Sequence, residues 1–227
     1  MAAGVFAAYL TDNSAPWWWM ASAILAIAAM TNFYNFMDGS NGLAGGMAVA
    51  GFCCYGIAGM ANAPGFAALC FAIAAAAAGF LCLNLTGRIF MGDGGSVPLG
   101  FLAAALGIEG WMRGLWPAWF APLVFAPFVV DASLTLARRM LRRERFWLAH
   151  REHYYQRLIR SGWPHLRLAG AEYGLMFACG AAALTARAGS FEIRIAAFAA
   201  IAALFLAAAI LIERRWRRHL AIQGLPR

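Results

Sequence analysis

Seven long apolar runs constrain the fold of this chain more than any other feature. They fall at residues 17–35, 43–61, 66–84, 97–112, 119–137, 169–186 and 195–212. A helix needs about 20 predominantly apolar residues to cross a bilayer, and the breaks between these runs carry Gly, Pro, Asn or Arg. Of the residues, 63% are hydrophobic and only 12% are charged. This is more apolar material than the core of one soluble domain can bury. The sequence predicts an all-α membrane protein, a polytopic transmembrane helix bundle of about seven spans that forms one domain over residues 1–227.

The positive charge of the chain comes entirely from arginine and is unevenly placed. If the loop around Asp38 is cytoplasmic, alternation puts the loops at about 36–43, 85–96 and 138–168 and the tail 213–227 on that same side. Fifteen of the 18 arginines then lie inside, and only Arg113, Arg187 and Arg194 lie outside. The positive-inside rule favours this orientation. Arginines placed between apolar runs fit membrane loops rather than a nucleic-acid face, so we expect no nucleic-acid partner.

The first polar motif covers residues 32–46, where a predicted span meets the cytoplasm. Asn32, Asn35 and Asp38 recur every three residues, so they share one face if the helix continues. The glycines that follow Asp38 let the backbone turn tightly and approach a ligand. A polar helix end with a glycine cap would show the same residues, so the motif by itself leaves both interpretations open.

The second polar motif covers residues 84–100, on the same predicted side. Asp93 stands between Gly92 and Gly94, so its carboxylate has little steric cover and is suited to a metal held on a diphosphate. Mg²⁺ typically takes one or two protein carboxylates and completes its shell with phosphate oxygens and water. The glycine and serine amides nearby could cradle phosphate. A plain turn before a helix would not explain why Asn84 and Arg88 gather there too.

The third polar motif runs from Asp131 into a histidine-bearing loop at residues 150–158. A carboxylate inside a predicted span is costly unless it is paired or lines a polar cavity, and Asp131 lies about two turns from Arg138. His150 and His153 are three residues apart and could face one way on a helix, where they would grip phosphate. A transporter that uses Asp131 with the arginines is an alternative class. It predicts an internal repeat, which the sequence does not show.

In this order, the three motifs resemble the polyprenyl-phosphate N-acetylhexosamine-1-phosphate transferase family. The pattern Asn-x-x-Asn-x-x-Asp-Gly matches residues 32–39, Phe-Met-Gly-Asp-x-Gly-Ser matches 90–96, and the histidine loop matches 150–158. The last segment looks most like the subgroup that initiates O-antigen or similar surface polysaccharides. The resemblance implies transfer of N-acetylhexosamine 1-phosphate from a UDP-N-acetylhexosamine to undecaprenyl phosphate, with release of UMP. It implies a multi-pass protein of the bacterial inner membrane, in contact with membrane lipids, and it leaves a homodimer open.

The resemblance also implies roles for individual residues. Asp93 would coordinate Mg²⁺, for which Mn²⁺ could substitute. Phe90 and Asn84 would line the uridine pocket, Asn35 and Asp38 would organise the catalytic centre, and His153 would help hold the phosphates. The implied catalytic residues are Asp38, Asp93 and His153, and the implied substrate-binding residues are Asn32, Asn35, Asn84, Arg88, Phe90, His150 and Arg151.

Three departures from the family pattern qualify this expectation. Asn41 stands where many relatives carry a second aspartate, and Tyr154 and Tyr155 stand where relatives often have adjacent histidines. Members of the family that the chain resembles are eleven-span bundles with an adjacent aspartate pair in their first half. This sequence has no two neighbouring acidic residues. The predicted spans match the last seven, with residues 1–10 as the stub of the one before. We therefore expect the chain to lack an N-terminal third, and an inactive remnant that binds lipid phosphate or a partner subunit is the alternative.

Overall fold

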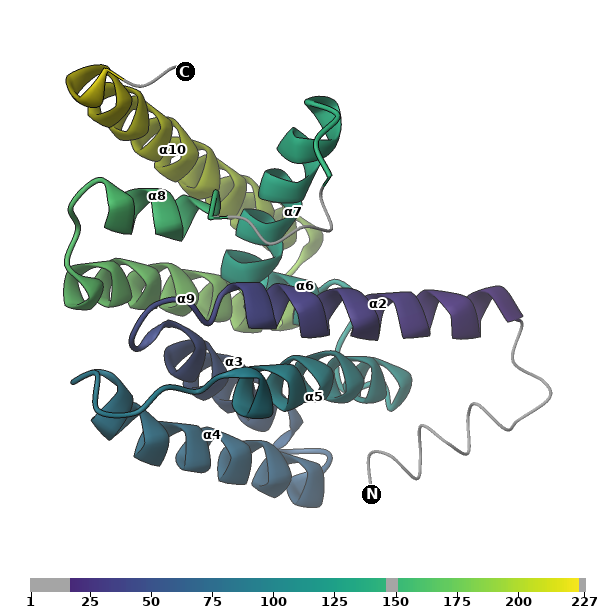
Figure 1. Ribbon diagram of the computed structural model, residues 1–227. Helices are drawn as coiled ribbons and strands as arrows, with labels where there is room; N and C mark the ends of the chain where they lie inside the picture. Colours follow the sequence, from purple (N-terminus) through teal and green to yellow (C-terminus); the bar gives the residue numbers. More distant parts are fainter. Residues whose placement is uncertain (1–16, 146–150, 225–227) are drawn as a thin grey trace.

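The computed structural model describes residues 17–145 and 151–224. All regular elements within these ranges are helices (Figure 1). They are α2 (Trp17–Phe36), α3 (Leu43–Gly59), α4 (Pro64–Asn84), α5 (Asp93–Met112), α6 (Phe120–Val124), α7 (Ala126–Leu141), α8 (Tyr154–Arg160), α9 (His165–Ala188) and α10 (Phe191–Gln223). The predicted all-α class is confirmed. The expected stub at residues 1–10 lies outside the described ranges.

Four of these helices, α4, α5, α9 and α10, are long and apolar enough to cross a membrane. Helix α3 is apolar but has 17 residues. The predicted span at 119–137 is two helices, α6 and α7, which meet at Phe125. Pro127 follows this junction, and because proline has no backbone N–H it cannot continue the hydrogen-bond ladder of α6. The run of apolar residues therefore predicted the segment but not its break.

Two helix boundaries also differ from the expected spans. Helix α5 begins at Asp93 rather than at Val97, so the glycine-rich segment forms its first turn. Helix α10 has 33 residues and continues well past Ile212. Its rise of about 1.5 Å per residue makes it roughly 50 Å long, against about 30 Å for a hydrocarbon core. Its last turns therefore extend beyond the apolar region as a helix, where a tail was expected.

Two helix pairs, α2 with α5 and α3 with α4, make the most extensive contacts in the bundle. Helix α9 connects the pair of α3 and α4 to the helices later in the chain, because it packs against α3, α6, α7 and α10. The segments between α2 and α3 and between α4 and α5, together with the start of α9, lie at one end of the bundle, at the left in Figure 1. The predicted gathering of the first two polar motifs at one end is thus seen in the fold.

Gly100 allows the backbones of α2 and α5 to approach closely. A Cβ atom at this position would lie 2.7 Å from Thr31 Cα and 2.9 Å from the Met30 carbonyl oxygen. Backbone atoms of a packed helix cannot move aside as a flexible side chain can. The seam between α2 and α5, which carries Asn35 and Asp93 to the same end, therefore depends on a glycine at this position.

We expect Gly100→Ala to lower the free energy of unfolding by about 1–3 kcal/mol, because overpacking forces the two helices apart. Thermal unfolding in detergent, followed by circular dichroism, measures the change. Gly79→Ala in α4 is the matched control, since a Cβ at Gly79 meets nothing within 4 Å. Equal melting temperatures for the two variants would contradict this account of the seam.

Candidate functional site

Asp38, in the loop between α2 and α3, and Asp93, the first residue of α5, form what we call the acidic centre. It lies at the end of the bundle that carries the first two polar motifs, which we call the site end. Asp38 lies near enough to the Gly92 backbone N–H and to the Asp93 carboxylate for both to affect its pKa. Burial raises the pKa of Asp38 to about 6, and the charge of Asp93 adds to the rise while the Gly92 N–H opposes it. Gly92 has φ 59°, in the left-handed region, which places this N–H at the start of α5. The first two motifs therefore bring two carboxylates together.

Asn35 is tied to the second motif through Ser96. The Ser96 hydroxyl lies 2.6 Å from Asn35 Oδ1 and 3.0 Å from the Gly92 carbonyl oxygen, and Ser96 is fully buried. Asn32 instead donates to the Ala28 carbonyl of its own helix at 2.8 Å and is exposed. Because α2 ends at Phe36, the three-residue spacing does not extend as one helical face to the loop aspartate. The helical face that was expected to carry Asn32, Asn35 and Asp38 therefore ends before Asp38.

Asn84 joins the first two motifs by its side-chain amide. Its Oδ1 accepts from the Gly42 backbone N–H at 2.7 Å, and its Nδ2 donates to the Ile89 carbonyl at 2.8 Å. The residue is buried, so its amide serves the backbone of both loops. Phe90, expected beside it in the uridine pocket, has a side chain that is 78% exposed, and Arg88 is exposed as well. These two residues face outward at the same end.

Two of the backbone amides expected to cradle phosphate are engaged within the protein. The Gly95 and Ser96 N–H groups both donate to the Gly92 carbonyl at 3.0 Å, as the first turn of α5 closes. This part of the expectation is therefore wrong for these two amides, because this part of the glycine-rich segment forms a helical turn rather than an open loop.

Asp131 is buried because it receives four hydrogen bonds. Its two oxygens accept from the backbone N–H groups of Tyr154 and Tyr155 at 3.0 and 3.1 Å and from the Thr135 hydroxyl at 3.2 Å. His153 Nδ1 lies 3.1 Å from Asp131 Oδ1. The carboxylate thus caps α8, and the first helical amides supply part of its counter-charge. His153 itself is 1% exposed, so the structure places it beneath the surface.

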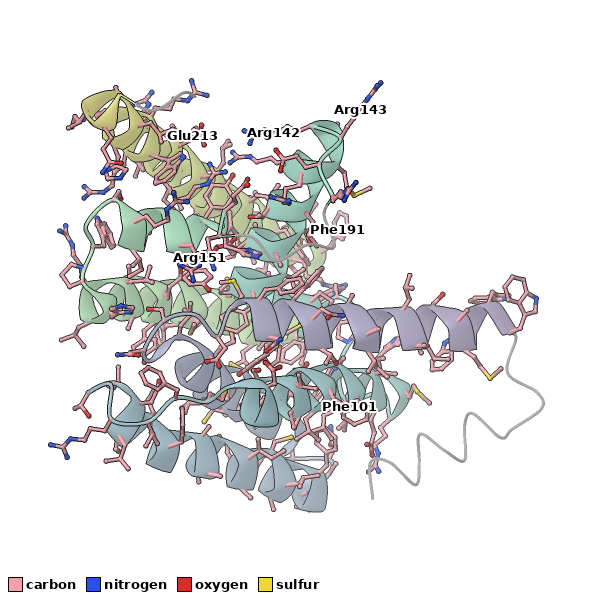
Figure 2. The ribbon with its side chains drawn as sticks, in the orientation of Figure 1. Phe101, Arg142, Arg143, Arg151, Phe191 and Glu213 are labelled. Atoms are coloured by element: carbon pink, nitrogen blue, oxygen red, sulfur yellow. The ribbon has the colours of Figure 1, made fainter. Side chains whose placement is uncertain are left out.

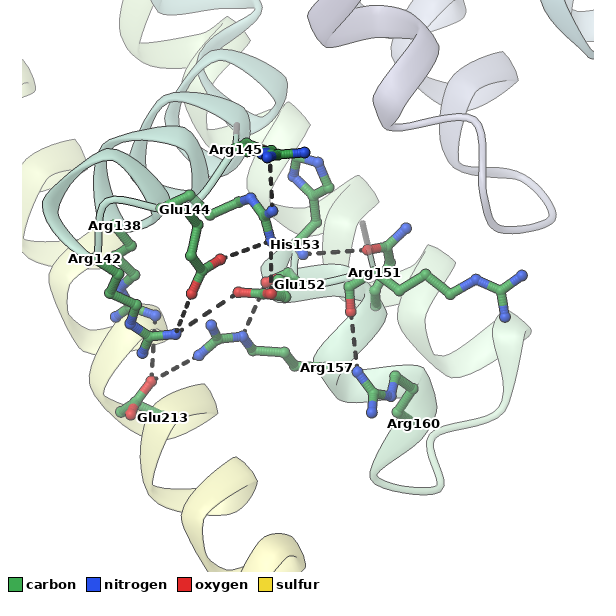
Figure 3. Close-up of polar contacts among 12 residues, drawn as sticks. Arg138, Arg142, Glu144, Arg145, Arg151, Glu152, His153, Arg157, Arg160 and Glu213 are labelled. Atoms are coloured by element: carbon green, nitrogen blue, oxygen red, sulfur yellow. Dashed lines mark hydrogen bonds and ion pairs between the residues drawn. The ribbon is translucent and has the colours of Figure 1, made fainter. Parts of the chain in front are cut away.

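The arginines that follow Asp131 pair with other acids. Arg138 and Arg157 donate to Glu213 of α10 at 3.3 and 3.0 Å, and Arg139 donates to Glu152 at 2.7 Å (Figure 3). A transporter interpretation that pairs Asp131 with these arginines therefore does not match the geometry. Arg151 is exposed and its carbonyl oxygen accepts from Arg160. His150 lies outside the described residues.

Three side chains from α8 and α9 hold the loop that carries Asp38. The Tyr155 hydroxyl donates to the Phe36 carbonyl at 2.9 Å, and the Tyr173 hydroxyl donates to the Gly42 carbonyl at 2.8 Å. His165 Nδ1 lies 2.9 Å from the Ser40 hydroxyl oxygen. We call Tyr155, His165 and Tyr173 the loop clamp. The sequence alone did not reveal it, because its members lie more than 100 residues from the loop.

The loop clamp gives a structural reason for one departure from the family pattern. Tyr155 stands where relatives often have histidine, and burial raises the pKa of its hydroxyl, which the charges of Asp131 and Asp38 raise further. It therefore stays a neutral donor at physiological pH. The charges of Asp131 and Asp38 both act on Tyr155. Tyr155 therefore lies between the histidine loop, which Asp131 binds, and the acidic centre, which includes Asp38. The third motif thus reaches the first through Tyr155.

Removing the Tyr155 hydroxyl should loosen the Asp38 loop without emptying the packing around it. We expect Tyr155→Phe to lower the turnover of the transfer reaction that the family resemblance implies by up to about tenfold, since one hydrogen bond contributes about 0.5–1.5 kcal/mol. Tyr154→Phe on the same helix is the control, because Tyr154 binds Asp131 through its backbone N–H. The turnover of the two variants would be measured under the same conditions. An equal loss in both would contradict a specific role of the Tyr155 hydroxyl in the loop clamp.

The acidic centre fits a divalent cation of the magnesium type. Among the described residues, no three His, Cys, Asp or Glu side chains gather as a complete metal cluster. Mg²⁺ does not need one, because it binds through one or two carboxylates and takes its other ligands from phosphate and water. Asp38 and Asp93 supply such a pair, and their mutual repulsion is what a bound cation would relieve.

Comparisons with known proteins agree with this arrangement of motifs. The sequence model of glycosyl transferase family 4 matches residues 3–110, a range that includes both aspartates of the acidic centre. The chain is 32% identical over 155 residues to the phospho-N-acetylmuramoyl-pentapeptide-transferase of Levilactobacillus brevis, covering 66% of the chain and 46% of the relative. It is 31% identical over 155 residues to a probable undecaprenyl-phosphate N-acetylglucosaminyl 1-phosphate transferase of Bacillus subtilis, covering 65% and 43%. The chain spans less than half the length of these relatives. Over residues 3–110, just under half of its length, the chain is similar to glycosyl transferase family 4.

Proposed function

We propose that this protein transfers N-acetylhexosamine 1-phosphate from a UDP-sugar to undecaprenyl phosphate and releases UMP. In this reaction an oxygen of the lipid phosphate attacks the phosphorus that carries the sugar. The new phosphorus–oxygen bond forms as the bond to UMP breaks, so UMP leaves with the negative charge. Such phosphoryl transfer depends on positioning and on charge stabilisation more than on covalent chemistry by the protein.

The observation that carries the proposal is the meeting of Asp38 with Asp93 at the start of α5. A diphosphate substrate brings several negative charges, which two bare carboxylates would repel. Mg²⁺, or Mn²⁺ in its place, would be held by these two residues and would supply the positive charge that the phosphates require. The relatives whose names specify phospho-sugar transfer support the same reaction class.

The other site residues act around this centre. Asn35, Asn84 and the loop clamp position the two acidic loops relative to each other. Exposed Arg88, Phe90 and Arg151 at the same end are available to contact the nucleotide and phosphates. His153, oriented by Asp131, acts as a positioning residue for α8 or as a donor to phosphate once substrate is bound. His150 and Asn32 complete the proposed substrate-binding residues.

The cellular setting follows from the same proposal. We place the protein in the bacterial inner membrane, with the site end facing the cytoplasm, because the arginine distribution favours that orientation. The histidine-loop motif at 150–158 supports a role in initiating O-antigen or another surface polysaccharide. The relatives from Levilactobacillus brevis and Bacillus subtilis keep cell-wall precursors open as the alternative product class.

Membranes that contain the chain provide the test. They would be incubated with undecaprenyl phosphate, Mg²⁺ and either UDP-N-acetylglucosamine or UDP-N-acetylgalactosamine, and the nucleotide product would be separated by chromatography. We expect UMP to form only when the lipid phosphate and the cation are both present. Release of UDP instead, or UMP formation that does not require the lipid, would overturn the proposal.

A further inference from the structure

A polar cavity lies between α8 and the end of α10, away from the acidic centre. Its volume is about 390 Å³. Four arginines and two glutamates line it, together with Trp216 and Leu220 of α10. Figure 2 shows Arg142 and Glu213 in the same part of the molecule, where α7, α8 and α10 meet, whereas Phe101 projects from α5 far from them. The proposed reaction does not use this cavity.

The two glutamates hold the arginines around the cavity without neutralising them all. Glu213 accepts from Arg157 and from Arg217 at 3.0 Å each, while Glu152 accepts from Arg139 and lies 3.8 Å from Arg142. The lining thus contains twice as many guanidinium groups as carboxylates. The side chains of Arg142 and Arg217 are 56% and 64% exposed. Their N–H groups are therefore accessible to an anion.

Aromatic contacts fix the remaining cationic groups. The guanidinium of Arg160 lies 4.8 Å from the ring centroid of Trp216, and that of Arg157 lies 6.0 Å from the same ring. Stacking on an indole holds a guanidinium flat. Arg157 already donates to Glu213 and to the Glu152 carbonyl, and one Arg160 nitrogen donates to the Arg151 carbonyl, so an anion would bind through the other N–H groups of Arg160. A phosphate oxygen pair matches the edge of a guanidinium in bidentate geometry. The cavity therefore has the fixed donors that phosphate recognition needs.

The depth of the cavity along α10 points to a lipid source for the phosphate. In the apolar window of α10 only 6% of the residues are buried inside the protein, so this segment faces lipid. Glu213 follows directly after the apolar run, and Leu220 lies about 10 Å further along the helix axis. The headgroup region extends roughly 5–8 Å beyond the hydrocarbon core, and Trp216 falls within it, where tryptophan is favoured.

We propose that this cavity binds the phosphate of an anionic phospholipid from the surrounding bilayer. The arginine edges bind the phosphate, and Trp216 and Leu220 contact the apolar start of the lipid chains. Such a lipid links α7, α8 and α10 through one ligand, at the end where α8 presents Tyr155 to the Asp38 loop. The site is separate from the place of the acceptor lipid phosphate, which must reach the acidic centre to react.

Native mass spectrometry of the full chain in detergent tests the site, with phosphatidylglycerol as the probe and phosphatidylcholine as the zwitterionic comparison. We expect a saturable one-to-one adduct with phosphatidylglycerol. Replacing two lining charges, Arg160→Gln with Arg217→Gln, should weaken it about 25-fold, since each basic residue near an anionic surface contributes about fivefold. Arg142→Gln is the second variant, with a loss of a few-fold expected.

The matched control removes two charges from the same stretch of α10 without touching the cavity. Arg214→Gln with Arg218→Gln does so, because neither residue lines it, and this pair should bind phosphatidylglycerol within twofold of the unmodified chain. An equal loss in both double variants would mean diffuse surface charge and overturn the proposal. Competition by equimolar inorganic phosphate would assign the cavity to a free anion instead. Adducts with undecaprenyl phosphate alone would assign it to the acceptor lipid.

Discussion

Asp93→Asn is expected to lower the rate of UMP release by at least about 100-fold, the cost of losing one group that stabilises charge in a transition state. The carboxamide keeps the size of the side chain and removes its charge. Asp93 is exposed in the first turn of α5, so the fold should persist with an unchanged melting temperature. The loss should therefore be chemical rather than structural, and steady-state rates at saturating substrate measure it.

Asp38→Asn should behave in the same way, and the two changes should not add. If both carboxylates act as one unit on a bound cation, the double variant should be about as slow as either single variant. Electron paramagnetic resonance of Mn²⁺ supplies a readout that does not depend on turnover, and both single variants should lose the bound signal. Additive losses, with Mn²⁺ still bound in either variant, would contradict a shared cation site.

Asp131→Ala is expected to lower the free energy of unfolding by about 3–5 kcal/mol, because it leaves the partners of a buried carboxylate without their acceptor. Those partners include the first amides of α8 and His153. The α8 helix should lose its cap, and with it the Tyr155 contact to the Asp38 loop. Hydrogen exchange of the peptide covering 153–160 should become much faster, with activity falling in parallel.

Thr135→Val is the control for the Asp131 prediction. The Thr135 hydroxyl donates to the same oxygen at 3.2 Å, but its loss leaves the carboxylate with its other three donors. We expect exchange in 153–160 to change little in this variant. Slow exchange at α8 in Asp131→Ala would show that the carboxylate does not hold the helix.

The helices were predictable where composition alone decides them. Runs of apolar residues located α2, α3, α4 and α9 within a few residues, because a helix packed in such a bundle needs a continuous apolar stretch. Of these four, α4 and α9 are long and apolar enough to cross a membrane. The end of α10 was not predictable in this way. Glu213 and Arg217 are spaced for an i,i+4 ion pair, at 3.0 Å, and good helix formers continue the helix where hydropathy has already fallen.

The acidic centre was predictable in part, and its supports were not. Asp38 and Asp93 each stand in a glycine-rich motif at a predicted loop, so their placement on the same side followed from the order of the spans, whereas their proximity did not. The contact of Ser40 with His165 joins residues 125 positions apart, and no local pattern marks either one. Asp131 was recognised as an unusual buried acid, yet its role as the cap of α8 depends on tertiary packing that sequence spacing does not show.

The central claim is that the acidic centre moves a sugar together with its phosphate. The direct test uses UDP-N-acetylhexosamine labelled with ³²P at the phosphorus that carries the sugar. With undecaprenyl phosphate and Mg²⁺ present, the account predicts that the label moves into the lipid fraction while unlabelled UMP appears in the water phase. Label that stays in water as UDP, with the sugar found on the lipid, would show ordinary glycosyl transfer and contradict the account.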